Sequence, residues 1–147
     1  MTILQAIQEA NTAAGIKNLA FADLTEFNSF KDGFNELDYP INVVVPFTVN
    51  SLFLNNRIKD SVLIRGWVLT RLREDTNDFR RIKIEPDYIN PMRIAAKKFV
   101  RRLLDSEVID SEVEGVNASF VPEYQFLDAH LFGVSYSFTL PTKSHIC

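Results

Sequence analysis

The chain has 147 residues, of which 46% are hydrophobic and 12% aromatic, and its formal net charge is −3. This length fits one domain around a single hydrophobic core, and the apolar content excludes a wholly disordered chain. No run of about 18 apolar residues or a secretory leader is visible, and the only cysteine, Cys147, cannot form an internal disulfide, so we expect a protein that folds in a cytoplasm.

Charge is unevenly distributed along the chain. Residues 1–56 carry a net charge of −4, residues 57–102 carry +7, and residues 103–147 carry −6. Such segregation can create a basic face and an acidic face that meet head to tail between copies of the protein. Alternatively, the fold interleaves the three segments and the charges neutralise each other within one molecule.

The first third of the chain predicts a helix, an irregular connection and a strand. Apolar residues at helical spacing predict a helix over residues 3–14, which Gly15 ends. Residues 16–39 hold four phenylalanines among Asp, Asn and Gly, which indicates an irregular connection with a helical turn. The β-branched segment 41–49 predicts an inner strand, although Pro46 favours an edge or a bulge.

The middle of the chain predicts a long strand. Residues 51–55 continue or pair with the preceding strand, and Asn55-Asn56 indicates a turn. Residues 59–73 then alternate so that Ile64 and Val68 share one side, whereas Arg65, Trp67 and their neighbours share the other. Neither side is purely polar, so we expect one face on the core and the other near a partner. A charged loop over residues 74–81 follows.

A helix over about residues 90–105 is the strongest local signal. Asn90 can cap it, and Pro91 suits the first helical position. Its apolar stripe leaves a polar side that carries five cations. They are Arg93, Lys97, Lys98, Arg101 and Arg102.

Two further strands complete the predicted fold. Residues 113–122 indicate a strand with a turn near Asn117, and residues 127–140 alternate between large apolar and small polar side chains. We expect a flexible tail from residue 141. The fold class is therefore α+β: a single domain over residues 1–147, with a mostly antiparallel β-sheet, one long helix (about 90–105) packed on it and an N-terminal helix (about 3–14).

No residue pattern predicts catalysis, a metal site or a cofactor. The two histidines and Cys147 form no ligand set of the usual spacing, and the glycines are scattered singly. The acidic run could in principle hold Mg²⁺ or transfer protons, but a solvated loop explains it more simply. Its members are Asp105, Glu107, Asp110, Glu112 and Glu114. We expect a protein that is not an enzyme.

Three segments carry a resemblance to a known class of protein: residues 39–41 (Tyr-Pro-Ile), residues 90–105, and residues 130–133 (His-Leu-Phe-Gly). In the order of its elements and in their residue patterns the chain resembles the neck proteins of tailed bacteriophages. In particular it resembles tail terminator, tail completion and head–tail connector proteins of phages that infect Bacteroidetes.

The resemblance implies a virion structural protein, made in the bacterial cytoplasm, that forms a six- or twelve-fold homo-oligomeric ring. Such a ring contacts portal, connector and tail-tube proteins, has no membrane partner, and passes DNA through its lumen. The candidate subunit-interface or charged-face residues are Arg65, Trp67, Arg71, Arg73, Arg93, Lys97, Lys98, Arg101, Arg102, Glu107, Asp110, Glu112 and Glu114. The alternative is a small cytoplasmic adaptor whose basic helix contacts a protein or a nucleic acid.

Overall fold

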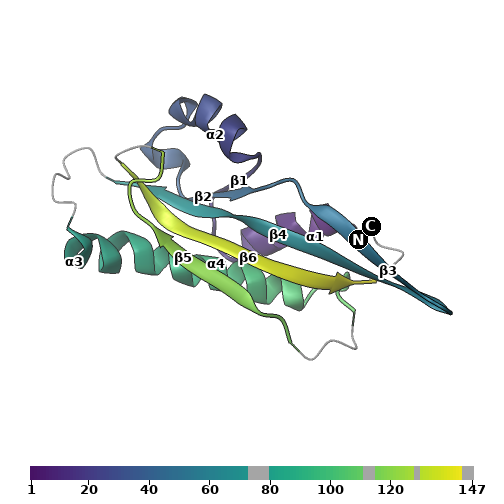
Figure 1. Ribbon diagram of the computed structural model, residues 1–147. Helices are drawn as coiled ribbons and strands as arrows, with labels where there is room; N and C mark the ends of the chain where they lie inside the picture. Colours follow the sequence, from purple (N-terminus) through teal and green to yellow (C-terminus); the bar gives the residue numbers. More distant parts are fainter. Residues whose placement is uncertain (73–79, 111–114, 128–129, 144–147) are drawn as a thin grey trace.

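A computed structural model describes residues 1–72, 80–110, 115–127 and 130–143 (Figure 1). It confirms the predicted α+β class, with a mostly antiparallel sheet, one long helix and an N-terminal helix. The strands are β1 (Asn18–Phe21), β2 (Ile41–Val44), β3 (Thr48–Leu54), β4 (Arg57–Arg71), β5 (Ala118–Glu123) and β6 (Leu131–Thr142). Their order in the sheet is β1-β2-β4-β6-β5, and β3 pairs with β4 beyond the end of β2.

β4 is the organising strand of the sheet. It pairs antiparallel with β2, β3 and β6, whereas β1 and β2 are parallel. In the β4–β6 register, Ile64 stands opposite Phe138 and Val68 opposite Val134. These side chains are all buried in one cluster with residues of the N-terminal helix and of the long helix. This burial confirms the predicted division of β4 into two faces.

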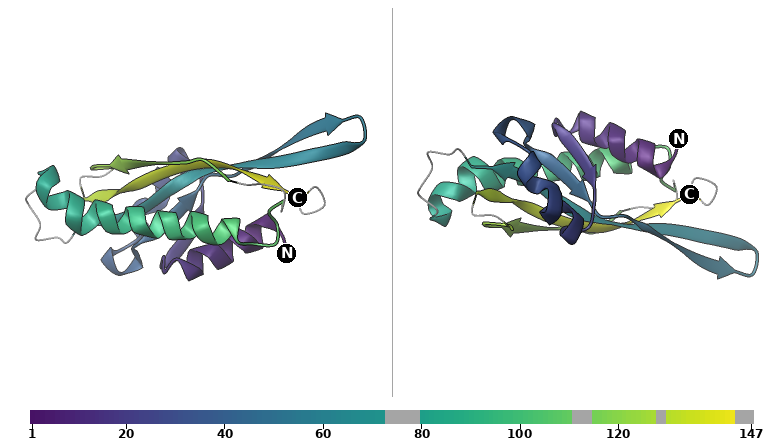
Figure 2. Two further views of the ribbon diagram at one scale, coloured as in Figure 1. Left: turned by 90° about the horizontal axis from the view of Figure 1, so that it is seen from below. Right: turned by 90° about the horizontal axis from the view of Figure 1, so that it is seen from above.

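Two helices cover that face of the sheet (Figure 2). α1 (Ile3–Ala13) begins with a capping box, in which Thr2 and Gln5 satisfy each other's backbone N–H groups. α4 (Asn90–Leu104) runs along β6 and contacts α1. Its apolar stripe, which includes Phe99 and Leu103, is buried against the sheet and α1, because helical spacing gathers these residues on one side.

The long helix begins earlier than predicted. α3 (Arg81–Ile84) leads through a π-helical turn, η3 (Glu85–Ile89), directly into α4, so the prediction that Asn90 caps the helix was wrong. Pro91 lacks the N–H that a regular α-helix would use at that position and its ring would clash with the preceding turn. The wider π-helical turn next to Pro91 accommodates both effects, and the helix continues.

The connection over residues 16–39 is more regular than predicted. It contains β1, the short helix α2 (Leu24–Phe30), and two 3₁₀ turns, η1 (Lys31–Gly33) and η2 (Glu36–Asp38). Asp23 caps α2 by accepting a hydrogen bond from the Glu26 N–H at 2.8 Å. Phe27 is fully buried in a second cluster with Ile41, Val43 and Leu69, on the face of the sheet opposite α1 and α4.

β3 and β4 form a hairpin that extends beyond the rest of the sheet (Figure 2). The predicted turn at Asn55-Asn56 joins the two strands. Pro46 lies between β2 and β3, where the backbone N–H of Val45 donates to the Arg65 carbonyl at 3.0 Å. The predicted single strand over residues 41–49 is therefore interrupted at Pro46, as its missing N–H requires.

The carboxyl-terminal strand also differs from the prediction. β6 continues through Pro141 and Thr142, which pair with Ser61 and Asp60, so the chain is ordered past the expected start of the tail at residue 141. Residues 144–147, with His145 and Cys147, lie outside the described residues, as do the loop residues 73–79 and the strand residues predicted at 113–114.

Candidate functional site

Four of the predicted interface cations form one surface on α4, which we call the basic strip: Lys97, Lys98, Arg101 and Arg102. All four side chains are exposed, because adjacent pairs one helical turn apart project from the same side of the helix. Arg101 lies 3.9 Å from Asp105, and both groups are largely exposed, so this pair adds little stability. No ion pair within the described residues involves Lys97, Lys98 or Arg102.

A shallow groove of about 450 Å³ runs beside the basic strip. Its floor includes Ala13 of α1 and Ile94 of α4, and the four cations and Asp105 line the rest. Ile94 is 47% exposed, so the strip combines positive charge with an accessible apolar side chain. Such a surface can bind an acidic partner that also brings an apolar residue.

Arg93 does not belong to the basic strip. Its guanidinium lies 3.0 Å from the Glu85 carboxylate, which also accepts a hydrogen bond of 2.5 Å from the Tyr124 hydroxyl. The hydrogen bond from Tyr124, with a smaller contribution from Arg93, lowers the pKa of Glu85, whereas burial raises the pKa of Tyr124. This cluster joins the start of the long helix to the end of β5.

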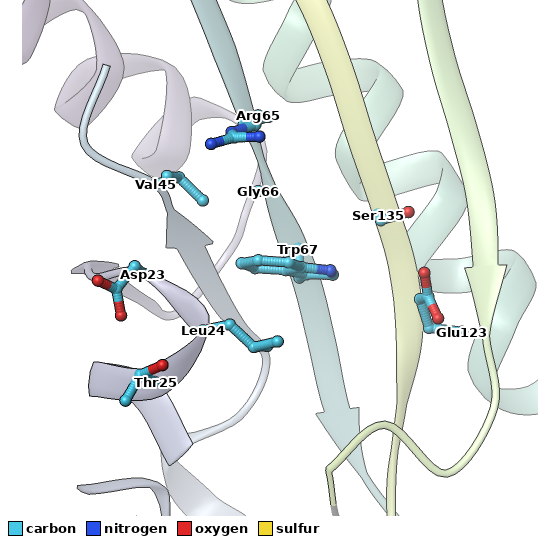
Figure 3. Close-up of a pocket in the computed structure, with 9 residues that line it drawn as sticks. All are labelled: Asp23, Leu24, Thr25, Val45, Arg65, Gly66, Trp67, Glu123 and Ser135. Atoms are coloured by element: carbon cyan, nitrogen blue, oxygen red, sulfur yellow. The ribbon is translucent and has the colours of Figure 1, made fainter. Parts of the chain in front are cut away.

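Arg65 and Trp67 lie together on the sheet face that α1 and α4 leave uncovered. Both are odd-numbered residues of β4, so they project to the same side, and they line a pocket of about 470 Å³ (Figure 3). We call it the sheet-face pocket, and its lining residues are Asp23, Leu24, Thr25, Val45, Arg65, Gly66, Trp67, Glu123 and Ser135.

Three elements position the sheet-face pocket. The Trp67 ring lies across its centre and packs on Phe126, with ring centroids 5.3 Å apart. Leu24 comes from the start of α2, and two carboxylates flank the pocket, Asp23 on the α2 side and Glu123 on the β5 side. The pocket therefore offers an aromatic and aliphatic floor between negative groups, with Arg65 at its edge.

The remaining predicted residues do not join these surfaces. Arg71 is half-buried at the far end of β4, opposite Leu131. Glu107 lies 3.4 Å from the N-terminal amino group, and the Asp110 N–H donates to the Pro141 carbonyl at 3.1 Å. Arg73, Glu112 and Glu114 lie outside the described residues.

The end of the β3–β4 hairpin is a surface that sequence reasoning missed. Every residue from Ser51 to Lys59 is exposed, including Leu52 at 59% and Phe53 at 74%. The available signal was the run Leu52-Phe53-Leu54 beside the Asn55-Asn56 turn, because three consecutive apolar residues cannot all face one core in a strand. Clusters of exposed apolar side chains such as this one are typical of contact surfaces.

The fold and these surfaces define an α+β protein with several prospective contact sites. Among the described residues, no group of three or more His, Cys, Asp and Glu side chains is arranged to hold a metal ion. No described helix combines the length and apolar character needed to cross a membrane. No protein-family model matches the chain, and no curated protein matches it either.

Proposed function

We propose that the protein is a non-enzymatic structural subunit that assembles with copies of itself into a ring. The observation that carries this proposal is the projecting hairpin, whose apolar residues are left exposed by the described part of the chain. An isolated two-stranded hairpin is at best marginally stable in water, so a partner surface explains why the chain retains one with Leu52 and Phe53 exposed.

Charge supports the same proposal. The basic strip has three cations with no ion pair among the described residues, whereas Asp23, Glu26 and Asp32 are exposed on and around α2, whose Phe27 packs on the opposite face of the sheet. Opposite charges on different sides of one molecule favour heterologous contacts, which generate rings when the rotation closes. The resemblance of the element order to phage neck proteins supports our proposal that the ring belongs to the head–tail junction of a virion.

Electron microscopy tests this function directly. Particles purified from infected cells and labelled with an antibody against the protein are expected to show label at the neck, and the purified protein is expected to form closed rings. Label on the capsid alone, or a single copy per particle, would contradict the proposal.

The alternative function, a small adaptor, is favoured by the groove beside the basic strip. Its cations and Ile94 suit an acidic peptide or a nucleic-acid backbone. Two observations together would favour this function over the ring. The protein would bind duplex DNA with an affinity that falls steeply with salt, and it would stay monomeric in host cells that contain no virions.

A further inference from the structure

The end of the β3–β4 hairpin projects from the sheet and carries exposed apolar and positively charged side chains, so it could insert into a partner. Beyond the Asp60–Thr142 pair, β4 has only β3 beside it within the described chain, so residues 51–59 form a two-stranded ribbon, which we call the hairpin tip. On one face the tip carries two exposed apolar anchors, Leu52 and Leu54, together with two cations, Arg57 and Lys59. It contains no acidic residue, and neither cation has an ion pair among the described residues.

The sheet-face pocket has the complementary chemistry. Trp67 and Leu24 supply an apolar floor, and the carboxylates of Asp23 and Glu123 stand on its two sides (Figure 3). The Glu123 carboxylate has no ion pair among the described residues. A volume of about 470 Å³ lies within the range of about 300–1,000 Å³ typical of binding pockets.

The tip cannot reach the pocket of its own chain. Arg57 and Trp67 belong to the same continuous strand, β4, and ten residues of strand separate them. At about 3.3 Å per residue this places them roughly 33 Å apart along a rigid sheet. A contact between the two surfaces must therefore join different molecules, and it is heterologous when the tip and the pocket of one molecule meet two different neighbours.

We propose that the hairpin tip of one copy occupies the sheet-face pocket of the next copy. Leu52 and Leu54, which share one face of the hairpin with Arg57 and Lys59, pack against Trp67 and Leu24, while the two cations approach the carboxylates of Asp23 and Glu123. This inference rests on the proposed ring and names its subunit contact. In the ring each molecule gives its tip to one neighbour and receives the tip of another, so the contact propagates head to tail until the ring closes.

Trp67 is the only tryptophan in the chain, which makes its fluorescence a direct reporter of the pocket. In a concentration series of the intact protein, light scattering is expected to show a rising mass as acrylamide quenching of Trp67 falls. The double variant Leu52→Asp/Leu54→Asp is expected to lower the association constant at least tenfold and to leave Trp67 open to quenching at every concentration.

A matched control separates this effect from a general loss of apolar surface. Leu37 and Ile82 are 76% and 77% exposed and lie outside both surfaces, so the variant Leu37→Asp/Ile82→Asp is expected to assemble as the wild type does. Circular dichroism is expected to show all three proteins folded, because every substituted side chain is exposed.

Mixing two defective variants tests whether the tip pairs with the pocket. The pocket variant Leu24→Asp keeps its tip, and the tip variant keeps its pocket, so each alone is expected to remain monomeric. An equimolar mixture is expected to form 1:1 dimers and nothing larger, because one intact tip and one intact pocket remain per pair.

The outcomes distinguish the inference from the proposed function. A tip variant that assembles with Trp67 still shielded overturns the tip-in-pocket contact while leaving the ring in place. A wild-type protein that stays monomeric at all concentrations overturns self-recognition by the tip, and neck labelling in virions then decides separately whether the protein is a neck component. Dimers formed by either variant alone would overturn the tip-in-pocket contact, because each variant lacks one of the two surfaces.

Discussion

Gly66 and Tyr136 are paired residues of β4 and β6, and the tyrosine hydroxyl lies 2.7 Å from the point where a β-carbon at residue 66 would stand. The Val43 carbonyl oxygen lies closer still to that point. The absent side chain lets the hydroxyl reach Asn42 on β2, where it donates a hydrogen bond of 2.7 Å to Oδ1. One glycine therefore allows a buried polar bridge across three strands.

Substitution of Gly66 by alanine is expected to destabilise the protein strongly. The new β-carbon would collide with backbone as well as with Tyr136, so β2 and β4 must separate locally. We expect a loss of about 3 kcal/mol in the free energy of unfolding, measured by urea denaturation. Gly33→Ala is the control, because nothing lies within 4 Å of its β-carbon position; equal stability of the two variants would refute this account of Gly66.

The Tyr136→Phe variant isolates the buried hydrogen bond. It leaves Oδ1 of Asn42 without this donor, and Asn42 Nδ2 already has no partner among the described residues. We expect a cost of about 1–3 kcal/mol at neutral pH, because an unsatisfied polar group then remains buried. A variant as stable as the wild type would show that the hydroxyl contributes nothing to the fold.

The same tyrosine predicts a stability change in alkali. Burial raises the pKa of Tyr136 above its ordinary value of 10. The unfolded chain then ionises at a lower pH than the folded protein, so the stabilisation is complete below about pH 10 and falls as the pH rises above it. Urea titrations between pH 8 and pH 11 are expected to show a steeper loss for the wild type than for Tyr136→Phe.

Glu85 is expected to change the stability of the protein in acid, in the opposite direction of pH to Tyr136. The Tyr124 hydrogen bond and Arg93 lower the pKa of Glu85 below its ordinary value of 4.5, so the ionised group stabilises the fold above that pH and loses this effect as the pH falls. The Glu85 side chain is 38% exposed, and solvent screening limits the contribution to less than about 1 kcal/mol. In Glu85→Gln, stability is expected to depend less on pH between 5 and 3; an unchanged acid profile would assign no role to this carboxylate.

Charge reversal on the basic strip tests its part in assembly. Lys97→Glu/Arg101→Glu is expected to block ring formation and leave the monomer folded, because both side chains are exposed and only Arg101 has a weak intramolecular partner. Light scattering at physiological salt measures the mass. The same change in net charge elsewhere, in Lys17→Glu/Lys83→Glu, is the control. Normal assembly of the Lys97/Arg101 variant would exclude the basic strip from the interface.

The predicted α+β class and the β4 face pattern could be read from the sequence, because both follow from local periodicity. In β4 and β6 the alternation of side chains is a property of the strand itself, and the buried residues Ile64 and Phe138 lie where it predicted. The basic strip could also be predicted from the sequence, because the spacing of Lys97 and Arg101 places them on one side of any helix.

The start of the long helix could not be predicted from the sequence. The pair Asn90-Pro91 is a typical helix-start signal, and its local preference competes with packing of the preceding turn. Ile84 and Ile89 are buried in the main core, so their burial favours continuing the helix through a π-helical turn. Tertiary packing thus outweighed the capping preference.

Local spacing along the chain fixes the periodic elements and the charge on each of them, because neighbours along a helix or strand set which side chains share a face. Which surfaces exist depends instead on how the elements pack together. The sheet-face pocket joins Leu24, Trp67 and Glu123 from three elements, and the hairpin tip is exposed because no other strand extends beside it. Both depend on distances through space, which local spacing along the chain does not encode.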